Sequence, residues 1–178
     1  LSLIDREVIK ASVDGLISDD MDFRGFLYAG LMLTEDGPKL LEYNCRFGDP
    51  EAQAVLPLVG GDFSSYLFEA ASGSLQQDLI SFDESWSICL VLASAGYPNS
   101  SRNDDVIRGL DSVEGVRVYH AGTKKNESGE YVTNGGRVLA VVGRGDDRES
   151  AVRNSYNEAS KVSFDGDQRR SDIGQMHF

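Results

Sequence analysis

The segment from Leu41 to Glu51 most constrains the fold of this chain, because a strand that carries charged side chains runs directly into the start of a helix. Successive side chains of a strand point to opposite faces. We therefore expect Glu42, Asn44 and Arg46 to share one polar face, with apolar side chains on the other. This pattern predicts a polar cluster at the end of the strand.

The residues that follow predict how the strand gives way to a helix. Gly48 is expected to end the strand, and Asp49, Pro50 and Glu51 suit the N-cap, the first helical position and the first turn of a helix. The helix is expected to continue over residues 53–58. The polar cluster is thus predicted to lie at a junction between two elements.

The polar cluster suits the binding of a cation and of an anion. Glu42 and Asn44 offer oxygen ligands of the kind that magnesium takes from proteins, while its remaining ligands come from phosphates and water. Arg46 offers a fork of N–H donors that matches a phosphate or an acyl phosphate. A polar strand face is also typical of an ordinary solvent-exposed strand, so this pattern alone leaves both interpretations open.

The first half of the chain is predicted to contain helices and one hairpin. Apolar residues at helical spacing predict a helix over residues 1–10. An Asp-Gly turn between residues 26–34 and 39–46 predicts that these two stretches pair as antiparallel strands. Asp62 is a suitable cap for a helix over residues 63–73.

The second half is richer in strands and closes on a single helix. Alternating or β-branched composition predicts strands at residues 85–95, 116–120, 130–133 and 137–142. A helix over residues 147–162, capped by Asp146 or Asp147, is expected to pack one face onto these strands.

These elements predict an α+β fold with two domains. Residues 1–78 would form a domain of antiparallel strands and helices, with the boundary in the polar stretch at residues 74–78. Residues 79–178 would form a small β-rich domain, a compact sandwich or barrel with one helix.

Composition and charge exclude several classes of function. The chain is 40% hydrophobic and 26% charged, which is ordinary for a folded domain. Lys and Arg number 17 against 29 Asp and Glu, and the net charge of −12 repels nucleic acids and anionic membrane surfaces. No apolar run approaches the roughly 18 residues that span a bilayer. We therefore expect no nucleic-acid or membrane partner and a cytoplasmic location.

Three single residues invite functional roles that the sequence supports less well. Cys45 and Cys89 show neither a C-x-x-C spacing nor the density of a disulfide scaffold, so both are expected to be reduced core residues. His120 could carry a proton, but a histidine without a visible partner is more often a hydrogen-bonded structural residue. We assign no catalytic role to it.

Several motifs, in one order along nearly the whole chain, carry a resemblance to a known family. They are Tyr28-Ala29-Gly30-Leu31-Met32, Glu42-Tyr43-Asn44-Cys45-Arg46-Phe47-Gly48-Asp49-Pro50-Glu51, His120-Ala121-Gly122-Thr123, Thr133-Asn134-Gly135-Gly136-Arg137-Val138-Leu139 and Arg170-Ser171-Asp172-Ile173-Gly174. Together they resemble the phosphoribosylamine–glycine ligase family, also called glycinamide ribonucleotide synthetases, of the ATP-grasp superfamily. Ser171 interrupts the Arg-Asp-Ile-Gly order of that family, so a role for this tail stays open.

The resemblance implies that the chain is the C-terminal portion of a longer enzyme. The family combines an N-terminal α/β domain, a pair of ATP-grasp subdomains and a C-terminal β-rich domain, for which 178 residues are too few. The first domain would then be the end of the ATP-grasp domain. Its partners would be the N-terminal and ATP-grasp segments of the parent, which carry the rest of the nucleotide site, and the fragment alone is expected to lack activity.

The resemblance also implies a reaction and its cofactors. Members of the family join glycine to 5-phosphoribosylamine in purine biosynthesis, with ATP cleaved to ADP and phosphate through a glycyl phosphate intermediate. ATP and Mg²⁺, or Mn²⁺, would be the cofactors. Glu42 and Asn44 would hold the metal and with it the nucleotide, and Arg46 would be a catalytic residue that contacts the transferring group and the substrate.

Four further residues are implied to bind substrate, and each also has a structural explanation. Asp49 and Glu51 would face substrate or metal, although a helix start already explains both. Gly136 would let the backbone approach a ligand and Arg137 would meet a phosphate, although paired glycines before a strand usually form a turn.

Two other functions remain open at this point. One is a different carboxylate–amine ligase or carboxylase of the ATP-grasp superfamily, which would share E-x-N-x-R but not the Phe-Gly-Asp-Pro-Glu extension. The other is a non-catalytic scaffold. The sequence also leaves open whether the parent carries one enzymatic activity or several.

Overall fold

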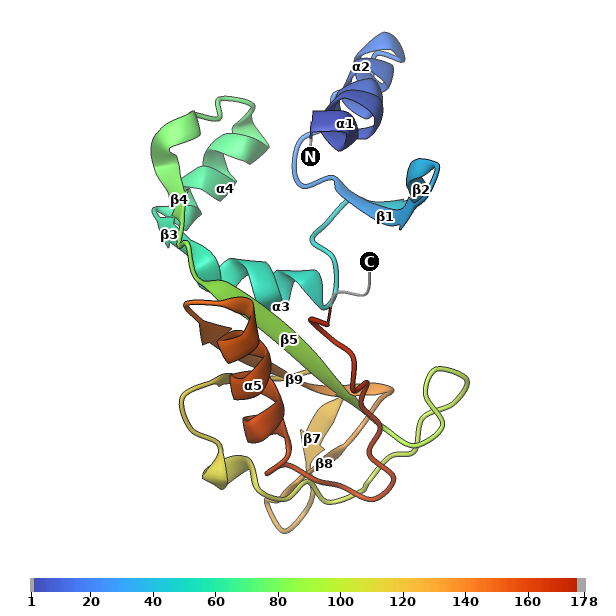
Figure 1. Ribbon diagram of the computed structural model, residues 1–178, viewed down its shortest axis with the longest axis vertical. Helices are drawn as coiled ribbons and strands as arrows, with labels where there is room; N and C mark the ends of the chain where they lie inside the picture. The colour runs from blue at the N-terminus through green and yellow to red at the C-terminus, as the bar shows by residue number, and fades with distance from the viewer. Residues whose placement is uncertain (1, 176–178) are drawn as a thin grey trace. The chain divides into compact units, whose positions relative to one another are not determined.

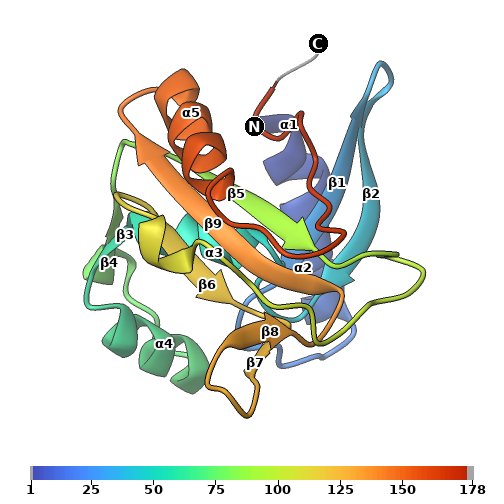
Figure 2. The same cartoon turned by 90° about the horizontal axis from the view of Figure 1, so that it is seen from below.

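The computed structural model describes residues 2–175, and the path of the chain can be followed in Figures 1 and 2. The described residues form two compact units. The first unit comprises the chain up to Asp49 together with Gly60–Ser81, and the second comprises Pro50–Val59 together with the chain from Phe82 onwards. Because residues 50–59 belong to the second unit, the chain passes between the units more than once. A domain boundary at residue 78 stays a prediction.

A helical segment opens the first unit. It consists of α1 (Ser2–Ile4), a π-helical stretch η1 (Asp5–Lys10) and α2 (Ala11–Ser18). The helix predicted over residues 1–10 is confirmed from residue 2 onwards, while residue 1 lies outside the described residues. The helix continues to Ser18 because a polar turn follows only there.

The predicted hairpin is confirmed and forms the sheet of the first unit. Strands β1 (Tyr28–Thr34) and β2 (Gly37–Asn44) pair in antiparallel fashion, with Gly30 opposite Glu42 and a register shift just after Gly30. Strand β1 begins later than the predicted residue 26, and strand β2 ends before the predicted residue 46. The hairpin is visible as one ribbon of two strands in Figure 2.

The predicted cap of the next helix is also confirmed. Helix α4 (Phe63–Ser72) begins after Asp62, whose carboxylate accepts a hydrogen bond from the Ser65 N–H at 3.0 Å. The helix ends at Gly73, which has a left-handed φ of 74°. Arg24 Nη1 donates to the carbonyl of the last helical residue at 2.9 Å, so a cation meets the negative end of the helix dipole.

Short elements connect the two units along the chain. They are η2 (Leu56–Leu58), β3 (Val59–Gly61), η3 (Gln77–Leu79) and β4 (Ile80–Phe82), and β3 pairs with β4.

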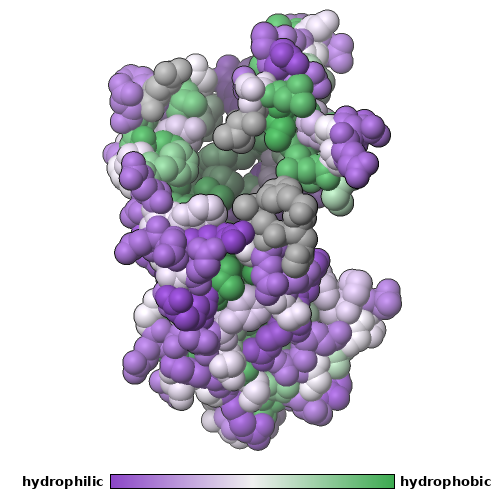
Figure 3. All heavy atoms as spheres, in the orientation of Figure 1, coloured by the Kyte–Doolittle hydropathy of each residue, from purple (hydrophilic) through white to green (hydrophobic). Residues whose placement is uncertain are grey.

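The first unit exposes large apolar side chains. Ile17 is 70% exposed, Leu41 64% and Leu33 62%, and green apolar surface over the helices and the hairpin of this unit is visible in Figure 3. Contiguous exposed apolar surface is typical of places where another segment or protein packs. The first unit by itself therefore leaves apolar faces uncovered.

The second unit is built around a three-stranded antiparallel sheet. Its strand order is β5 (Trp86–Ala93), β9 (Arg137–Gly145) and β6 (Arg117–His120), and the remaining elements are α3 (Glu51–Val55), η4 (Leu110–Ser112), the hairpin of β7 (Thr123–Lys125) and β8 (Tyr131–Thr133), and α5 (Arg148–Ala159). The four predicted strands of this half are confirmed as β5, β6, β8 and β9. Strand β7 was missed because Thr123 and the two lysines after it have the composition of a turn.

A helix packs on each face of this sheet. The face towards α5 belongs to a cluster of Leu90, Leu92, Leu139, Val141 and Ala159. The other face forms a smaller cluster, in which α3 takes part, of Cys89, Ala140, Val142 and Ala54. The predicted α+β class is confirmed, but the sheet is open, with helices on it where a sandwich would have a second sheet.

Ser155 is a buried polar residue that ties α5 to the sheet. Its hydroxyl oxygen lies 2.9 Å from the Ile88 carbonyl oxygen, to which it donates, and accepts from the Gly143 N–H, also at 2.9 Å. A Cβ at Gly143 would lie 2.5 Å from this oxygen, so glycine is required for the close approach of helix and strand. At its start, α5 has the expected cap, Asp147, which accepts from the Ser150 N–H at 2.7 Å.

The two cysteines differ in burial. Cys89 is buried and Cys45 is exposed, and both are free thiols. The expectation that both lie in a core is therefore wrong for Cys45, which lies in the bend after β2 and not within a buried strand. None of the helices within residues 2–175 is both long and apolar enough to cross a membrane.

We predict that the buried centre of β9 governs the stability of the second unit. Val141 has 0% exposure, so Val141→Ala should lower the free energy of unfolding by about 2–3 kcal/mol through lost burial and a residual cavity. Val55→Ala is the matched control, since Val55 lies in the same unit but is 40% exposed. Chemical denaturation measures both, and equal losses would contradict the assignment of the core.

A second prediction concerns Asp83, which precedes β5. Its carboxylate accepts from the Ser85 N–H at 2.8 Å and from Arg144 Nη2 at 2.6 Å. The Ser85 N–H foremost, then the Ser85 hydroxyl and Arg144, lower the pKa of Asp83 to about 2. A lowered carboxylate pKa stabilises the fold at pH values above the ordinary pKa of Asp, and this contribution is lost as the pH falls through about 2.

Carbon-13 NMR titration of the Asp83 carboxyl group measures this pKa. In Arg144→Gln it should move only part of the way to the ordinary value, because the Ser85 N–H remains in place. A wild-type midpoint at the ordinary aspartate pKa would show that these hydrogen bonds do not form in solution.

Candidate functional site

Glu42 and Asn44 lie together at the end of β2, as the alternation of the strand predicts. Asn44 Nδ2 donates to Glu42 Oε1 at 2.9 Å. On the paired strand, a Cβ at Gly30 would lie 3.0 Å from Glu42 Cγ, so glycine leaves room for the carboxylate arm. The two side chains thus form one polar group on one face of the hairpin.

The donor set of this pair fits a hard divalent cation. Since the amide of Asn44 uses its nitrogen toward Glu42, its oxygen and the second carboxylate oxygen keep no hydrogen-bond partner among residues 2–175. Two protein oxygens, completed by phosphate and water, are the usual coordination of magnesium on a nucleotide. In the described part of the chain, no group of three or more His, Cys, Asp or Glu residues could hold a metal ion by itself. Glu42 and Asn44 therefore supply part of a coordination sphere.

Arg46 does not continue the polar face of the strand. Strand β2 ends at Asn44 and the chain bends over the next two residues, so the strict alternation that placed Arg46 beside Glu42 is interrupted. Arg46 is exposed, and its Nη1 donates to the Phe47 carbonyl at 2.7 Å. Its position on a common strand face was wrongly predicted, and its catalytic role stays a prediction.

The helix after this bend begins one residue later than predicted. The N-cap of α3 is Pro50, which makes no side-chain cap hydrogen bond, so the prediction of Asp49 as the N-cap residue is wrong. Glu51 is the first helical residue, in the first turn as predicted. An acidic side chain is favourable there because it lies near the positive end of the helix dipole. Asp49 is the last residue of the first segment of the first unit, whereas Glu51 belongs to the second unit.

The second unit contains a cleft with a cationic rim. Its volume is about 440 Å³, and its lining comprises Pro50, Cys89, Leu90, Val91, Ala93, Tyr97, Arg137, Gln168, Arg169, Arg170 and Ile173. Three of these residues are arginines, and the described lining includes no Asp or Glu. An apolar floor under guanidinium groups suits a ligand that carries a phosphate or carboxylate.

The turn that carries Gly136 and Arg137 is held by close packing. A Cβ at Gly136 would lie 2.6 Å from Cδ2 of Tyr97, so the Tyr97 ring occupies the space that a side chain would need. The Gly122 N–H donates to the Arg137 carbonyl at 2.8 Å, and a Cβ at Gly122 would meet the same oxygen at 2.7 Å. These contacts give Gly136 a packing role, while its contact with a ligand stays a prediction.

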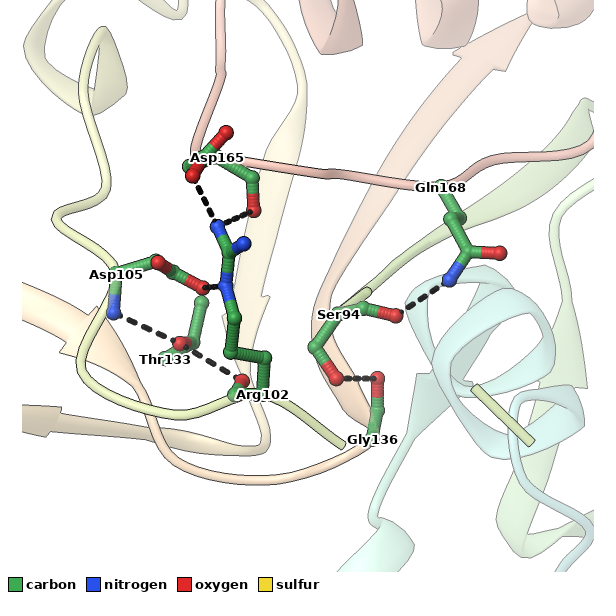
Figure 4. Close-up of polar contacts among 7 residues, drawn as sticks. All are labelled: Ser94, Arg102, Asp105, Thr133, Gly136, Asp165 and Gln168. Atoms are coloured by element: carbon green, nitrogen blue, oxygen red, sulfur yellow. Dashed lines mark hydrogen bonds and ion pairs between the residues drawn. The ribbon is translucent and has the colours of Figure 1, made fainter. Parts of the chain in front are cut away.

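A polar framework ties together the loop after β5, the turn before β9 and the chain beyond α5 (Figure 4). Arg102 is its main element: it donates to Asp105 Oδ2 and to the Asp165 carbonyl, both at 2.8 Å, and pairs with the Asp165 carboxylate. These partners raise the pKa of Arg102, and the hydrogen bond to Asp105 makes the largest contribution. Thr133, which is fully buried, accepts from the Asp105 N–H at 3.1 Å.

For two arginines of the cleft, Arg169 and Arg170, the sequence left the role open. Arg169 Nη2 donates to the Val162 carbonyl at 3.0 Å, and Arg169 also pairs with Asp167, so it mainly anchors the chain after α5. The Arg170 side chain is 71% exposed and pairs with Asp172, with 2.8 Å between Nε and Oδ1, which raises the pKa of Arg170. The adjacent arginines were a usable signal, but only the fold shows that they line a cleft with Arg137.

His120 makes the contacts of a structural residue. Its Nδ1 lies 3.0 Å from the Thr123 hydroxyl, and its ring lies 4.5 Å from the Tyr131 ring between centroids. It is absent from the lining of the cleft that holds Arg137. These contacts explain the histidine without a proton-transfer role.

The chain matches two sequence profiles of one family. The profile described as phosphoribosylglycinamide synthetase, C domain, matches residues 87–176, and the profile of the ATP-grasp (A) domain of the same enzyme matches residues 1–52. The chain belongs to the phosphoribosylglycinamide synthetase family. The C-domain match sets it apart from other ATP-grasp ligases, which are not expected to share that domain.

Curated relatives of this family are similar over nearly all of the chain. The phosphoribosylamine–glycine ligase of Caldanaerobacter subterraneus subsp. tengcongensis is 42% identical over 97% of the chain, which spans 41% of that enzyme. The trifunctional purine biosynthetic protein adenosine-3 of Chironomus tentans is 40% identical over the whole chain, which spans 13% of that protein. The chain thus corresponds to less than half of each, and one of these relatives is named as a trifunctional protein.

Solved structures agree with this family. The crystal structure of phosphoribosylamine–glycine ligase from Thermotoga maritima superposes with a TM-score of 0.79 at 34% identity, over 94% of this chain and 41% of that one. The biotin carboxylase domain of 2-oxoglutarate carboxylase from Hydrogenobacter thermophilus, solved with MgADP, ADP and bicarbonate, gives 0.54 at 20% identity, over 79% of this chain and 32% of that one. The second likeness shows a shared fold only.

We predict that Gly136 is needed because of Tyr97. Gly136→Ala should destabilise the second unit by about 1–3 kcal/mol, since the new methyl group would overlap the Tyr97 ring. In a Tyr97→Ala background the same substitution should cost much less, because the space is then empty. Unfolding of the two single variants and the double variant gives the coupling, and additive losses would show that Tyr97 does not restrict this position.

Proposed function

We propose that the chain is the C-terminal portion of an ATP-dependent phosphoribosylamine–glycine ligase. The enzyme would join the carboxyl group of glycine to the amine of 5-phosphoribosylamine, with ATP cleaved to ADP and phosphate. The observation that carries this proposal is the Glu42–Asn44 oxygen pair, in a chain that matches both the ATP-grasp and the C-domain profiles of one family. The parent would act in purine biosynthesis in the cytoplasm.

The proposed reaction requires activation of a carboxylate. A carboxylate is a poor acylating agent, and transfer of the ATP γ-phosphoryl group onto glycine gives glycyl phosphate, whose phosphate is a good leaving group. The amine of phosphoribosylamine then attacks the carbonyl carbon and phosphate departs. The protein's task is to neutralise charge on the transferring group and to hold the reactants in line.

Glu42 and Asn44 would hold the divalent metal in this reaction. Bound Mg²⁺, or Mn²⁺ in its place, would offset the negative charge of the ATP phosphates. Arg46, which is exposed in the bend after β2, would contact the transferring group. Asp49 and Glu51, which flank the start of α3, remain candidates for contacts with substrate.

The cleft of the second unit would hold the phosphate of phosphoribosylamine. Arg137 and Arg170 line it without a carboxylate in the described lining, and a guanidinium matches the geometry of a phosphate. Gly136 supports this arrangement through the turn that carries Arg137. The local positive charge would act despite the net charge of −12.

The exposed apolar faces of the first unit would be covered by other segments of the parent enzyme. Curated relatives are more than twice as long as this chain, and the ATP-grasp profile ends within it at residue 52. The N-terminal and remaining ATP-grasp segments are the proposed partners of side chains such as Ile17 and Leu41.

The metal assignment can be tested in the full-length enzyme that contains this segment. Glu42→Gln should lower kcat/KM by about 10²–10³ and raise the magnesium concentration needed for half-maximal rate, because one anionic ligand is lost. Glu35→Gln, at an exposed carboxylate in the hairpin turn, is the matched control and should behave as wild type.

A second readout does not depend on activity. Mn²⁺ added to the wild-type 178-residue chain should broaden the NMR signals of the Asn44 side-chain amide, and Glu42→Gln should weaken that effect. Equal activity and equal broadening in the Glu42 and Glu35 variants would refute the metal site.

A further inference from the structure

The side-chain amide of Gln168 has a defined orientation. Its Nε2 lies 2.6 Å from the Ser94 carbonyl oxygen. A backbone carbonyl can only accept a hydrogen bond, so the NH₂ end of the amide must face Ser94. The Gln168 carbonyl oxygen is then turned away from Ser94, as Figure 4 shows.

Ser94 gives this amide a rigid anchor. It is fully buried, its N–H donates to the Gly136 carbonyl at 2.8 Å, and its carbonyl also accepts from the Tyr97 N–H at 3.2 Å. Gln168 is held a second time through its backbone, by reciprocal hydrogen bonds with Ala93 at 2.8 and 2.9 Å. A side chain fixed in this way loses little further conformational entropy when a ligand binds.

The oriented carbonyl is an acceptor in a cleft of donors. Gln168 is exposed and lines the cleft with Arg137 and Arg170, and within residues 2–175 its Oε1 makes no hydrogen bond. The guanidinium groups can only donate, so they suit phosphate oxygens. A fully ionised phosphate has no hydrogen to donate to a carbonyl oxygen. A hydroxyl or amine group of the same ligand can donate one.

We infer that Gln168 is a specificity-determining residue, whose side-chain carbonyl accepts a hydrogen bond from a sugar hydroxyl of a ligand whose phosphate meets Arg137 and Arg170. The ligand class is a pentose phosphate. This inference rests on the proposed function in one respect, namely that the cleft takes the phosphoribosyl substrate. It adds a residue that discriminates a sugar phosphate from phosphate alone.

The test uses the 178-residue chain with ribose 5-phosphate and inorganic phosphate as probes. Gln168→Met keeps the size of the side chain and removes its polar atoms. The affinity for ribose 5-phosphate should fall by about five-fold, the loss of one neutral hydrogen bond, while the affinity for inorganic phosphate stays unchanged. Calorimetry or NMR titration measures both dissociation constants.

Gln175→Met is the matched control. The Gln175 amide also donates to a backbone carbonyl, that of Ser171 at 2.9 Å, but Gln175 is not among the residues that line the cleft. Its replacement should leave both affinities at the wild-type level. In the wild-type chain, ribose 5-phosphate should shift the Gln168 side-chain NH₂ signals in NMR more than inorganic phosphate does.

The outcomes separate this inference from the proposed function. If Arg137→Met weakens both ligands but Gln168→Met leaves their affinity ratio unchanged, the cleft binds phosphate and Gln168 does not discriminate, so the inference is wrong. If Gln168→Met lowers the affinity for both ligands equally, the residue only holds the chain in place. That result would also overturn the inference. If the wild-type chain binds neither ligand, the phosphate cleft of the proposed function is refuted as well.

Discussion

The second unit depends on one constraint, the burial of β9 between two neighbouring strands and two helices. Val141 has no exposed surface and packs towards α5, while Ala140 and Val142 pack towards the face that carries α3. A strand buried on both faces cannot slip by one residue without moving its side chains to the wrong layer. The register of β9 therefore fixes the point at which Arg137 emerges at its start.

The cleft follows from that register through a small set of hydrogen bonds. Ser94, just after β5, binds the turn before β9 through the Gly136 carbonyl and the segment after α5 through Gln168. Three stretches that are distant in the sequence thus meet at one buried serine. Polar groups fixed in this way are preorganised, so the energy of ligand contacts is not spent on ordering the cleft.

The sequence predicted local features well and long-range ones poorly. Strand alternation correctly joined Glu42 to Asn44, and the cap at Asp62 was correctly located, because both depend on neighbouring residues only. The same reasoning failed at Arg46, where the chain bends, and at Asp49, where the helix begins one residue later. Gln168 was not singled out at all, since its contact with Ser94 spans 74 residues and leaves no periodic signal.

The charge of the chain illustrates why a site must be judged by its own neighbourhood. A net charge of −12 would argue against binding of any phosphorylated ligand if it acted as a whole. Surface charges are screened beyond roughly 10 Å at moderate ionic strength, so distant carboxylates contribute little to the field inside a cleft. The carboxylates near the arginine rim, such as Asp167 and Asp172, are already paired with arginines. Since the described lining of the cleft contains three arginines and no Asp or Glu, an acidic chain can still carry a locally cationic cleft.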